Sequence, residues 1–382
     1  SHVWITYLLF RYLKVQINKS KTNKYVIYIG LLAAIGTGIQ LVFLGSLIPV
    51  ILFILFEILV FKKITISNFS KRKFFLDVIK SFVVFYILLV IFWIDTYPNV
   101  FVLPFTFFLE TLSENFITGW PFNLIDGNYY LSNEIPKSYF FINLLFKSPE
   151  YFLFSYLIFI LLQIKTRIFF IENFNFFYYK LSLIIIILIF PSLVLLVVPY
   201  PIYDGMRLFL WSLPYFCIVP AITVYYLIEN FNYLSSKILS TLILFFAVLF
   251  LYKFFIITPY QYTYLNIFNG QNENRYKKFE NDYWATSIKE LINSSKLSKN
   301  DNLLISTCGV NDNIVKYYFD KYGYSNVNFV KHAQSNFVIM TNRTVFDETT
   351  EQITNCFDKF GGYDHHQIKK DGLLLSVIRR KN

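Results

Sequence analysis

The segment YDGMRLFLWSLP, residues 203–214, places Asp204 and Arg207 three positions apart between two long apolar runs. Ionisable side chains at the edge of a membrane are costly, and they usually face a partner or a water-filled cavity. An Arg there can bind two oxygens of a phosphate, and a nearby Asp can orient that Arg or a sugar hydroxyl. A helix-capping Asp and an interfacial Arg would give the same spacing, so both interpretations stay open.

A second candidate site follows the last long apolar run, in residues 258–287. Tyr262, Asp282 and Trp284 belong to a stretch rich in Tyr, Asn and Asp. Aromatic faces beside carboxylates and amides can hold a sugar ring by apolar contact and hydrogen bonds. Tyr and Trp also collect at membrane interfaces for reasons unrelated to a ligand. Composition alone does not separate these two interpretations.

These residues must be positioned by membrane helices, because 55% of the 382 residues are apolar and the mean hydropathy is +0.47. A span needs about 20 apolar residues. The apolar runs lie near 3–13, 25–61, 81–97, 149–164, 181–199, 206–228 and 238–258. Run 25–61 is too long for one span, and we expect it to break near 45–49. The sequence therefore predicts a mainly α transmembrane bundle of about seven to eight spans.

The net charge of +11 indicates orientation in the membrane and not a nucleic-acid partner. Lys and Arg gather in short loops, above all in 62–80, and such loops are typically cytoplasmic. Alternation from there places loop 98–147 and everything after 259 outside. Membrane lipids are the expected surroundings.

The composition divides the chain into a transmembrane domain, 1–258 with outer loop 98–147, and an extracytoplasmic α/β domain, 259–382. Within the loop, residues 98–120 read as a helix lying in the interface, and 126–128 read as a turn. The α/β domain is expected to contain helices near 286–297 and 312–322, strands 302–307 and 336–341, and a closing strand pair that turns at Asp371 and Gly372.

Cysteines and short motifs add little chemistry. Cys308 and Cys356 can pair if their domain lies outside the cytoplasm, although two buried free thiols fit the sequence equally well. No metal-ligand spacing is visible. The Asn342–Thr344 sequon and the adjacent His365 and His366 are interpreted as chance features.

Four segments in a fixed order, 35–49, 119–153, 203–214 and 259–287, carry a family resemblance. The chain resembles C-type (GT-C) integral-membrane glycosyltransferases, in the branch of protein mannosyltransferase-like and aminoarabinose transferase-like bacterial proteins. It departs from the family at Gln40 and Leu208, where Arg and His are common. These departures remove two of the family's frequent cations from the donor side.

The resemblance implies a hexosyl- or mannosyltransferase-like enzyme of the bacterial plasma membrane, which moves a sugar from a polyprenyl-phosphate donor at the outer face. The implied residues are Arg207 and Lys147 for the donor phosphate, Tyr203 and Asp204 to shape the site, and Trp120, Tyr262, Asn266, Asp282 and Trp284 to line the sugar or acceptor side.

The same resemblance leaves several roles open. In this family the catalytic base lies in an outer loop near the N-terminus of the whole protein; that loop is expected to be missing here, so no base is assigned and this segment alone should be inactive. The sugar, the acceptor and a need for divalent metal are not specified. A transporter or flippase of lipid-linked sugar, which favours two related halves, and a non-catalytic membrane scaffold are the alternatives.

Overall fold

The computed structural model describes residues 1–18, 21–65, 69–110, 119–197, 201–270 and 272–381. The chain divides into two compact units, and each is considered separately below. The first unit consists of Ser1–Phe116, Leu162–Val198 and Phe209–Val219, and the second of Ile117–Leu161, Pro199–Leu208 and Pro220–Asn382. The predicted domain boundary between residues 258 and 259 stays a prediction.

Most of the described chain is helical, and five helical segments are long and apolar enough to cross a membrane. They are Phe43–Phe61, Lys71–Phe92, Phe177–Val197, Arg207–Glu229 and Leu234–Ile256. A sixth arises if α7 (Tyr139–Lys147) and α8 (Glu150–Lys165), bent by 110°, form one broken span. The larger predicted number depends on α1 (His2–Ile17) and α2 (Asn23–Ile39), which have only 16 and 17 residues. Seven or eight spans therefore stay a prediction.

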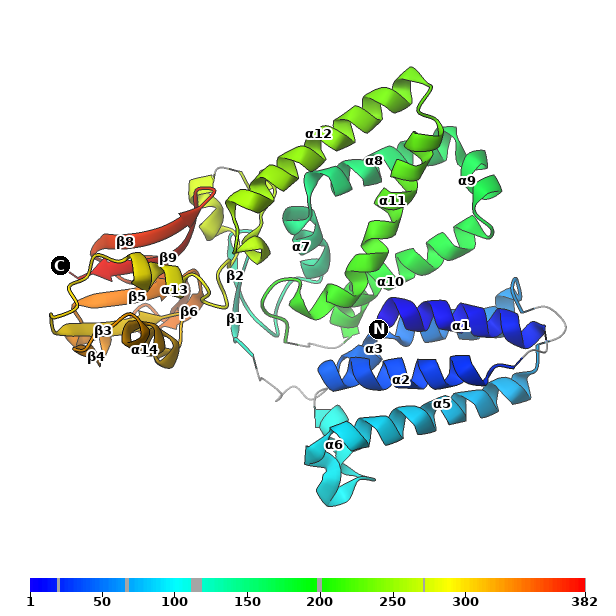
Figure 1. Cartoon of the computed structure of the whole chain (residues 1–382), viewed down its shortest axis with the longest axis horizontal. Coiled ribbons are helices and arrows are strands. Elements are labelled where there is room, and N and C mark those ends of the chain that lie inside the picture. The colour runs from blue at the N-terminus through cyan, green and yellow to red at the C-terminus, as the bar shows by residue number, and fades with distance from the viewer. Residues whose placement is uncertain (19–20, 66–68, 111–118, 198–200, 271, 382) are drawn as a thin grey trace. The chain divides into compact units, whose positions relative to one another are not determined.

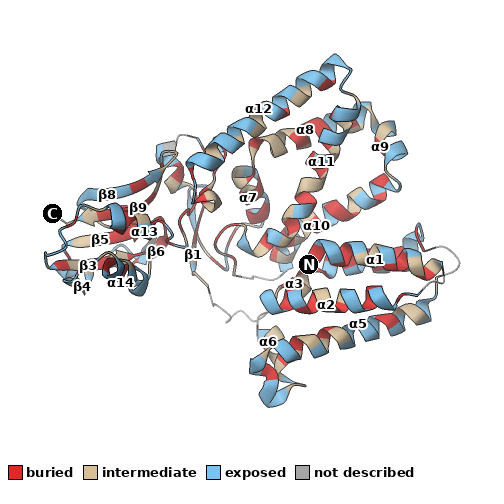
Figure 2. Cartoon of the chain, viewed as in Figure 1, coloured by how far each residue is buried: buried red, intermediate tan, exposed pale blue. Residues whose placement is uncertain are grey.

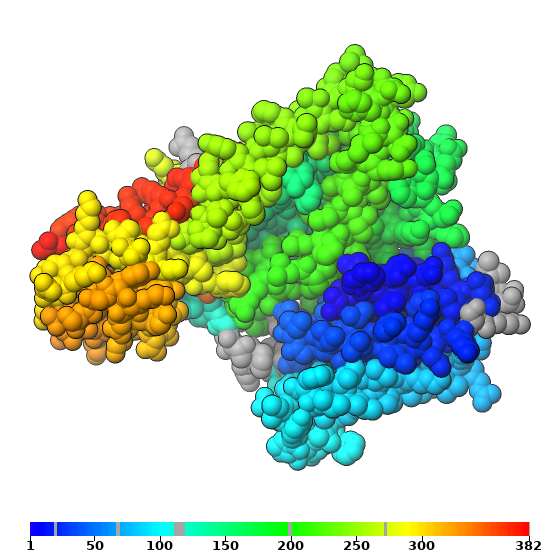
Figure 3. All heavy atoms as spheres, in the orientation of Figure 1, coloured from blue at the N-terminus to red at the C-terminus, as the bar shows by residue number. Residues whose placement is uncertain are grey.

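In the first unit, α2 lies between α1 and α5 (Lys71–Phe92), as Figures 1 and 3 show in blue and cyan. Gly30 permits the close approach of α2 to α5. A Cβ at this position would lie 2.5 Å from the backbone oxygen of Ser81. Because the helices pack through small residues, their backbones come close together, as membrane helices commonly do.

The long apolar run 25–61 breaks earlier than the sequence predicted. α2 ends at Ile39, where Gln40 takes an extended backbone conformation, and the chain turns before α3 (Phe43–Ser46). At Leu47, between α3 and α4 (Ile48–Phe56), the backbone keeps helical torsions. The chain therefore does not turn at the predicted position 45–49. Pro49 lies in the first turn of α4, where its missing N–H costs no hydrogen bond.

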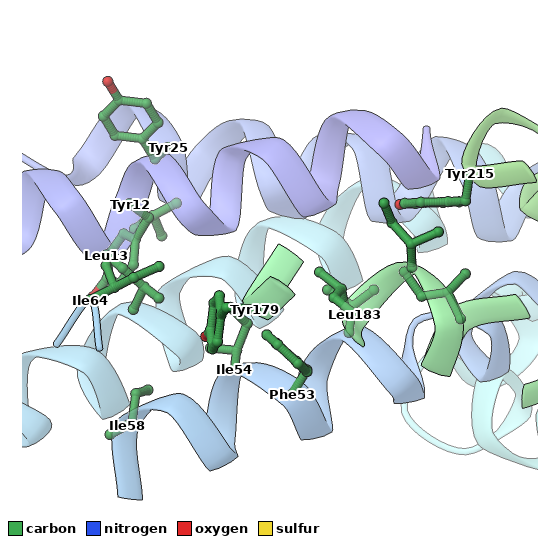
Figure 4. Packing of buried hydrophobic residues seen from close by; sticks show 14 residues of the cluster. Tyr12, Leu13, Tyr25, Phe53, Ile54, Ile58, Ile64, Tyr179, Leu183 and Tyr215 are labelled. Atoms are coloured by element: carbon green, nitrogen blue, oxygen red, sulfur yellow. The ribbon is translucent and has the colours of Figure 1, made fainter. Parts of the chain in front are cut away.

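The core of this unit forms where α1 and α4 meet α10 (Phe177–Val197), as Figure 4 shows. Leu13, Val50 and Ile187 are fully buried there. Phe53 packs against Tyr179, with 4.8 Å between their ring centroids. α9 (Arg167–Asn173) precedes α10, and a short segment, Ile94–Asn99, leads from α5 to α6 (Leu103–Glu110). The predicted interfacial helix 98–120 is seen as far as Glu110, and residues 111–118 lie outside the described chain.

The apolar surface of α12 (Leu234–Ile256) is exposed along nearly its whole length (Figure 2). Only 6% of its most apolar 18-residue stretch is buried within the protein. A helix with this composition needs an apolar solvent, which the bilayer supplies. α12 is therefore a lipid-facing helix, and the protein is an integral membrane protein. α11 (Leu213–Glu229) precedes it in the chain.

The predicted turn at 126–128 closes a β-hairpin in the second unit. Strands β1 (Phe122–Ile125) and β2 (Asn128–Leu131) pair antiparallel. Asp126 and Gly127 connect them with φ of 47° and 84°, which is the left-handed pair that a two-residue hairpin favours. The hairpin joins the C-terminal part of the chain, because Gly127 N–H donates to the Lys278 carbonyl at 3.1 Å.

The C-terminal domain is built on a mixed five-stranded sheet with strand order β4-β3-β5-β9-β8. β3 pairs parallel with both β4 and β5, and β9 pairs antiparallel with both β5 and β8. The strands are β3 (Leu303–Cys308), β4 (Val327–Phe329), β5 (Phe337–Thr341), β8 (Tyr363–Lys370) and β9 (Leu373–Arg380). β5 and β9 lie in the interior of the sheet and are largely buried, as expected for continuous apolar strands.

Every element that the sequence predicted for this domain is present. The helices are α13 (Ile288–Ser294) and α14 (Asp312–Lys321), and the closing pair turns at Asp371 and Gly372. Sequence reasoning missed β4 and a second hairpin, β6 (Thr344–Asp347) with β7 (Gln352–Asn355), followed by the short α15 (Cys356–Lys359).

Candidate functional site

The predicted phosphate-binding segment forms a tight left-handed turn in the second unit. Asp204 and Gly205 have φ of 59° and 63°. A Cβ at Gly205 would lie 2.6 Å from Lys147 Nζ, so both the torsion and the close approach require glycine. The Tyr139 hydroxyl donates to the Gly205 carbonyl at 3.1 Å. These contacts bring Lys147, at the end of α7, against the turn that carries Asp204.

Hydrogen bonds from the β1–β2 hairpin fix the chain just before this turn. Ile202 N–H donates to the Ser132 carbonyl at 3.0 Å, and the Asn123 amide donates to the Ile202 carbonyl at 2.8 Å. Asn123 also donates to the Ser132 hydroxyl. The Tyr203 ring lies directly against Gly119, where a side chain would clash with it. The hairpin thus positions Tyr203 and Asp204, and their role in shaping a site stays a prediction.

Asp204 accepts hydrogen bonds from two arginines. Its carboxylate is 5% exposed, with Oδ2 lying 3.2 Å from Arg207 Nη1 and Oδ1 lying 2.6 Å from Arg343 Nη1. Arg343 was not predicted. Charge-assisted bonds of this kind are stronger than neutral ones, and burial weakens the screening by water. Asp204 therefore holds two guanidinium groups close together.

Arg343 is the buried member of this pair. It lies between β5 and β6, and its side chain is 6% exposed. Its guanidinium carbon is 4.4 Å from the Trp120 ring centroid and 6.0 Å from that of Tyr283. A second carboxylate, Glu280, lies 3.5 Å from Arg343 Nη1. The two carboxylates and the two aromatic rings thus stabilise the buried positive charge of Arg343.

Glu280 and Trp120 both bind the residue that follows Arg343. Glu280 Oε1 accepts the Thr344 N–H at 2.6 Å, and Trp120 Nε1 donates to the Thr344 carbonyl at 2.7 Å. Burial raises the pKa of the Glu280 carboxyl above its ordinary value, although the Arg343 guanidinium opposes this shift. Trp120, which was predicted to line the sugar or acceptor side, thus packs on Arg343 and supports it.

The Cys308–Cys356 disulfide supports Arg343 from the other side. The two cysteines are bonded, with their Cα atoms 5.7 Å apart, which confirms the pairing that the sequence allowed. Cys356 N–H donates to the Arg343 carbonyl at 2.9 Å. A disulfide in this domain is consistent with an oxidising, extracytoplasmic location.

Arg207, in contrast, is the exposed arginine of the cluster. Its side chain is 48% exposed, and its guanidinium carbon lies 5.7 Å from the Trp284 ring centroid. A guanidinium carries five N–H groups, and within the described residues only Nη1 contacts a carboxylate. The remaining donors point to no described acceptor. Trp284 is 55% exposed and stacks on Tyr262, with 5.8 Å between ring centroids.

Asp282 and Asn266 lie in the same unit but hold the backbone together. Asp282 is fully buried and accepts from the Thr286 and Ser287 N–H groups at 2.9 and 3.0 Å, and from the Tyr262 hydroxyl. Asn266, also fully buried, donates to the Ser148 carbonyl at 3.0 Å. Both polar groups are thus occupied by protein partners, and neither faces a space for a sugar.

Glu150 anchors the segment that leaves α12. At the start of α8, its carboxylate accepts from the Tyr264 hydroxyl at 2.6 Å and the Ile267 N–H at 2.9 Å, and it pairs with Lys253 at 3.3 Å. The carboxylate therefore joins α8, α12 and the exit segment. As with Arg343, no local sequence pattern indicates these long-range contacts.

The structure therefore brings most of the predicted residues together around Asp204. Arg207, Lys147, Tyr203 and Trp120 lie about the turn, and Trp284 connects Arg207 to Tyr262. The missed residues are Arg343 and Glu280. Arg343 belongs to the Asn342–Thr344 sequon, whose Asn342 is fully buried and donates to the Phe279 carbonyl. The one available signal was a charged residue placed just after a buried strand.

Within the described residues, no group of three His, Cys, Asp or Glu side chains is arranged to hold a metal ion. Comparison of the chain with protein-family models, with curated proteins and with solved structures finds no match.

Proposed function

We propose that the protein is a membrane glycosyltransferase which takes a sugar from a polyprenyl-phosphate donor at the outer membrane face, and that Arg207 binds the donor phosphate. The observation that carries this proposal is that the Arg207 guanidinium is half exposed and has N–H groups that bind no described acceptor. Its ion pair with the buried Asp204 holds it in this position.

The charge around the turn suits an anion. Among the described residues, two carboxylates, Asp204 and Glu280, face three cations, Arg207, Arg343 and Lys147, so the cluster keeps a positive charge. Because Arg343 satisfies Asp204 from the buried side, Arg207 is free to share its donors with a phosphate. Donors held in place before the ligand arrives are effective at stabilising a leaving phosphate.

The aromatic surface beside Arg207 suits the sugar of such a donor. Trp284 and Tyr262 form a stacked pair next to the guanidinium, and Trp284 is largely exposed. Sugar rings pack their C–H faces on such rings, while their hydroxyls need polar neighbours. This arrangement supports a sugar attached to the phosphate and located on the side of Trp284.

The experiment measures binding of polyprenyl monophosphate to the protein in lipid nanodiscs, and sugar transfer in native membranes. We expect Arg207→Ala to weaken binding at least tenfold and to reduce transfer, and Arg207→Lys to restore only part of both, because Lys lacks the two-pronged donor geometry. Arg167→Ala is the matched control, since Arg167 is another exposed arginine.

The results separate the proposal from its alternatives. Unchanged binding and transfer in Arg207→Ala, at normal expression, would overturn the phosphate role. Binding without transfer, together with movement of the labelled lipid between leaflets, would favour a flippase. No binding by the wild-type protein would favour a non-catalytic scaffold.

A further inference from the structure

The first unit contains a cleft that the proposed function does not use. It lies where α1 and α2 are connected and where α5 begins, and it measures about 360 Å³. Four basic side chains line it: Lys21, Arg72, Lys73 and Lys80. We call it the basic cleft.

The positive charge of the basic cleft is largely uncompensated. Among the described residues that line it, Asp77 is the only acidic one. Its partner Lys80, at 3.6 Å, is 61% exposed. Among the described residues, Lys21, Arg72 and Lys73 form no ion pair. α5 moreover begins with Lys71, Arg72 and Lys73 and has no acidic residue in its first turn. Cations at a helix N-terminus oppose the helix dipole, so a bound anion would relieve this arrangement.

Asp77 itself does not repel an anion strongly, because protein donors surround it. It is 3% exposed, and its Oδ2 accepts from the Tyr12 hydroxyl at 3.0 Å and from the Thr22 hydroxyl at 2.9 Å. Through these two hydrogen bonds, the Asp77 carboxylate joins α5 to α1 and to the start of α2 at the cleft. Asp77 also lines a second space, so the two spaces lie on either side of one residue.

The second space is an apolar groove of about 300 Å³ between α1, α2, α4 and α5. Apart from Asp77, the Tyr12 hydroxyl and Ser81, its lining is hydrocarbon and aromatic, with Ile5, Val26 and Phe85 among the residues. Along α5 the residues that line the groove run from Phe74 to Phe85, which is about 16 Å at 1.5 Å per residue. One leaflet of the hydrocarbon core is about 15 Å thick.

We propose that the basic cleft and the groove bind one anionic glycerophospholipid, with the phosphate headgroup against Arg72 and Lys73 and an acyl chain in the groove. A small phosphate would fill only the cleft, and a zwitterionic lipid would bring no net charge to it. In the predicted topology this end of the helices faces the cytoplasm, where basic pockets between membrane helices bind anionic headgroups. The lipid then holds α1, α2 and α5 together.

The test measures lipid retained by the purified protein, using native mass spectrometry with dioleoyl-phosphatidylglycerol and dioleoyl-phosphatidylcholine. We expect preferential retention of phosphatidylglycerol, and an affinity roughly 30-fold lower in Arg72→Ala/Lys73→Ala, from two lost charges. Lys71→Ala is the matched control, because Lys71 occupies the same helical turn but does not line the cleft.

A second pair of variants tests the groove without disturbing the core. Val78 lines the groove and is 46% exposed, whereas Ile79 is 45% exposed and does not line it. We expect Val78→Trp to reduce retention of phosphatidylglycerol and Ile79→Trp to leave it unchanged. Inorganic phosphate should not displace the lipid.

Four results would each overturn the proposal. They are equal retention of the two phospholipids, an equal loss in Lys71→Ala, full displacement by inorganic phosphate, and tighter binding of polyprenyl phosphate than of phosphatidylglycerol. Elution of each variant at the wild-type volume in size-exclusion chromatography shows that the fold is kept, and Arg72→Gln/Lys73→Gln replaces the double Ala variant if it is not. Loss of sugar transfer in Arg207→Ala has no bearing on these results, because Arg207 lies in the other unit.

Discussion

Arg343 Nη1 lies 2.6 Å from Asp204 Oδ1, although 139 positions separate the two residues in the chain. The same carboxylate binds the exposed Arg207 at 3.2 Å. One aspartate thus holds a buried cation that supports the fold and an exposed cation that is free to meet a ligand. The two arginines should respond to substitution in opposite ways.

Arg343→Ala is expected to destabilise the protein far more than Arg207→Ala. Removing Arg343 leaves Asp204 without its buried partner and breaks the ion pair of Glu280, and breaking a buried pair typically costs about 3–5 kcal/mol. Arg207 is half exposed, so its pair with Asp204 contributes about 0–1 kcal/mol. Thermal unfolding in detergent measures the stability of both variants. For the variants that fold, we expect Arg207→Ala to weaken binding of polyprenyl phosphate more than Arg343→Ala does. Equal destabilisation would contradict the division of roles.

Replacing Cys308 and Cys356 by Ser is expected to lower the free energy of unfolding by about 4 kcal/mol, from the 48-residue separation and the chain-entropy estimate. The Arg343 carbonyl would also lose a fixed partner, because Cys356 N–H donates to it. Cys217→Ser is the control, since Cys217 is a free thiol. Mass-tagging of thiols on unfolded, unreduced protein should label Cys217 alone; labelling of all three cysteines would show that the bond is absent.

Gly205→Ala should cost more than Gly323→Ala. Both glycines have positive φ, 63° and 78°, which costs an Ala residue roughly 1–2 kcal/mol. Only at Gly205 does the new Cβ also clash with a side chain, because Lys147 Nζ would lie 2.6 Å away, whereas the nearest atom to a Cβ at Gly323 would be 4.0 Å away. The difference in melting temperature between the variants therefore measures the contact. Gly205→Ala/Lys147→Ala should recover that difference, and a failure to recover it would show that Lys147 is not the obstacle.

Stability should depend on pH through Glu280. Burial raises the pKa of this carboxyl in the folded protein, so the folded state holds its proton more tightly than the unfolded chain does. The stabilising contribution of the protonated group is present below the ordinary pKa of about 4.5 and is lost as pH rises through the folded pKa. The stability of wild type relative to Glu280→Gln should therefore fall as pH increases from about 4. A flat difference across this range would contradict the assignment.

The elements of the C-terminal domain were predictable because their apolar residues follow clear periods. β3 and β5 are short apolar runs, and Asp371 and Gly372 supply the left-handed residues of the final turn. β4 has only three residues, too few to show alternation. In the run 25–61 nearly every residue is apolar, so periodicity vanishes; Gln40, the only amide in that run, marks the true end of α2.

The candidate site was only half predictable, for a different reason. Asp204 and Arg207 are close in sequence, so their spacing is visible. Arg343 reaches Asp204 through the pairing of β5 and the turn before β6, and no local pattern records such a contact. Asp282 shows the opposite case. Its residue type suggested a ligand-binding role, but its carboxylate accepts hydrogen bonds from the backbone N–H groups of Thr286 and Ser287.

The position of β9 in the sheet has a consequence for biosynthesis. This strand pairs with β5 on one side and β8 on the other, yet it comes last along the chain among the strands that the structure describes. Until the ribosome has translated residues up to Arg380, β5 has an open edge beside the turn that carries Arg343. The strand that precedes Arg343 therefore gains its second neighbour in the sheet only after the long apolar helices, which end at Ile256, have been translated.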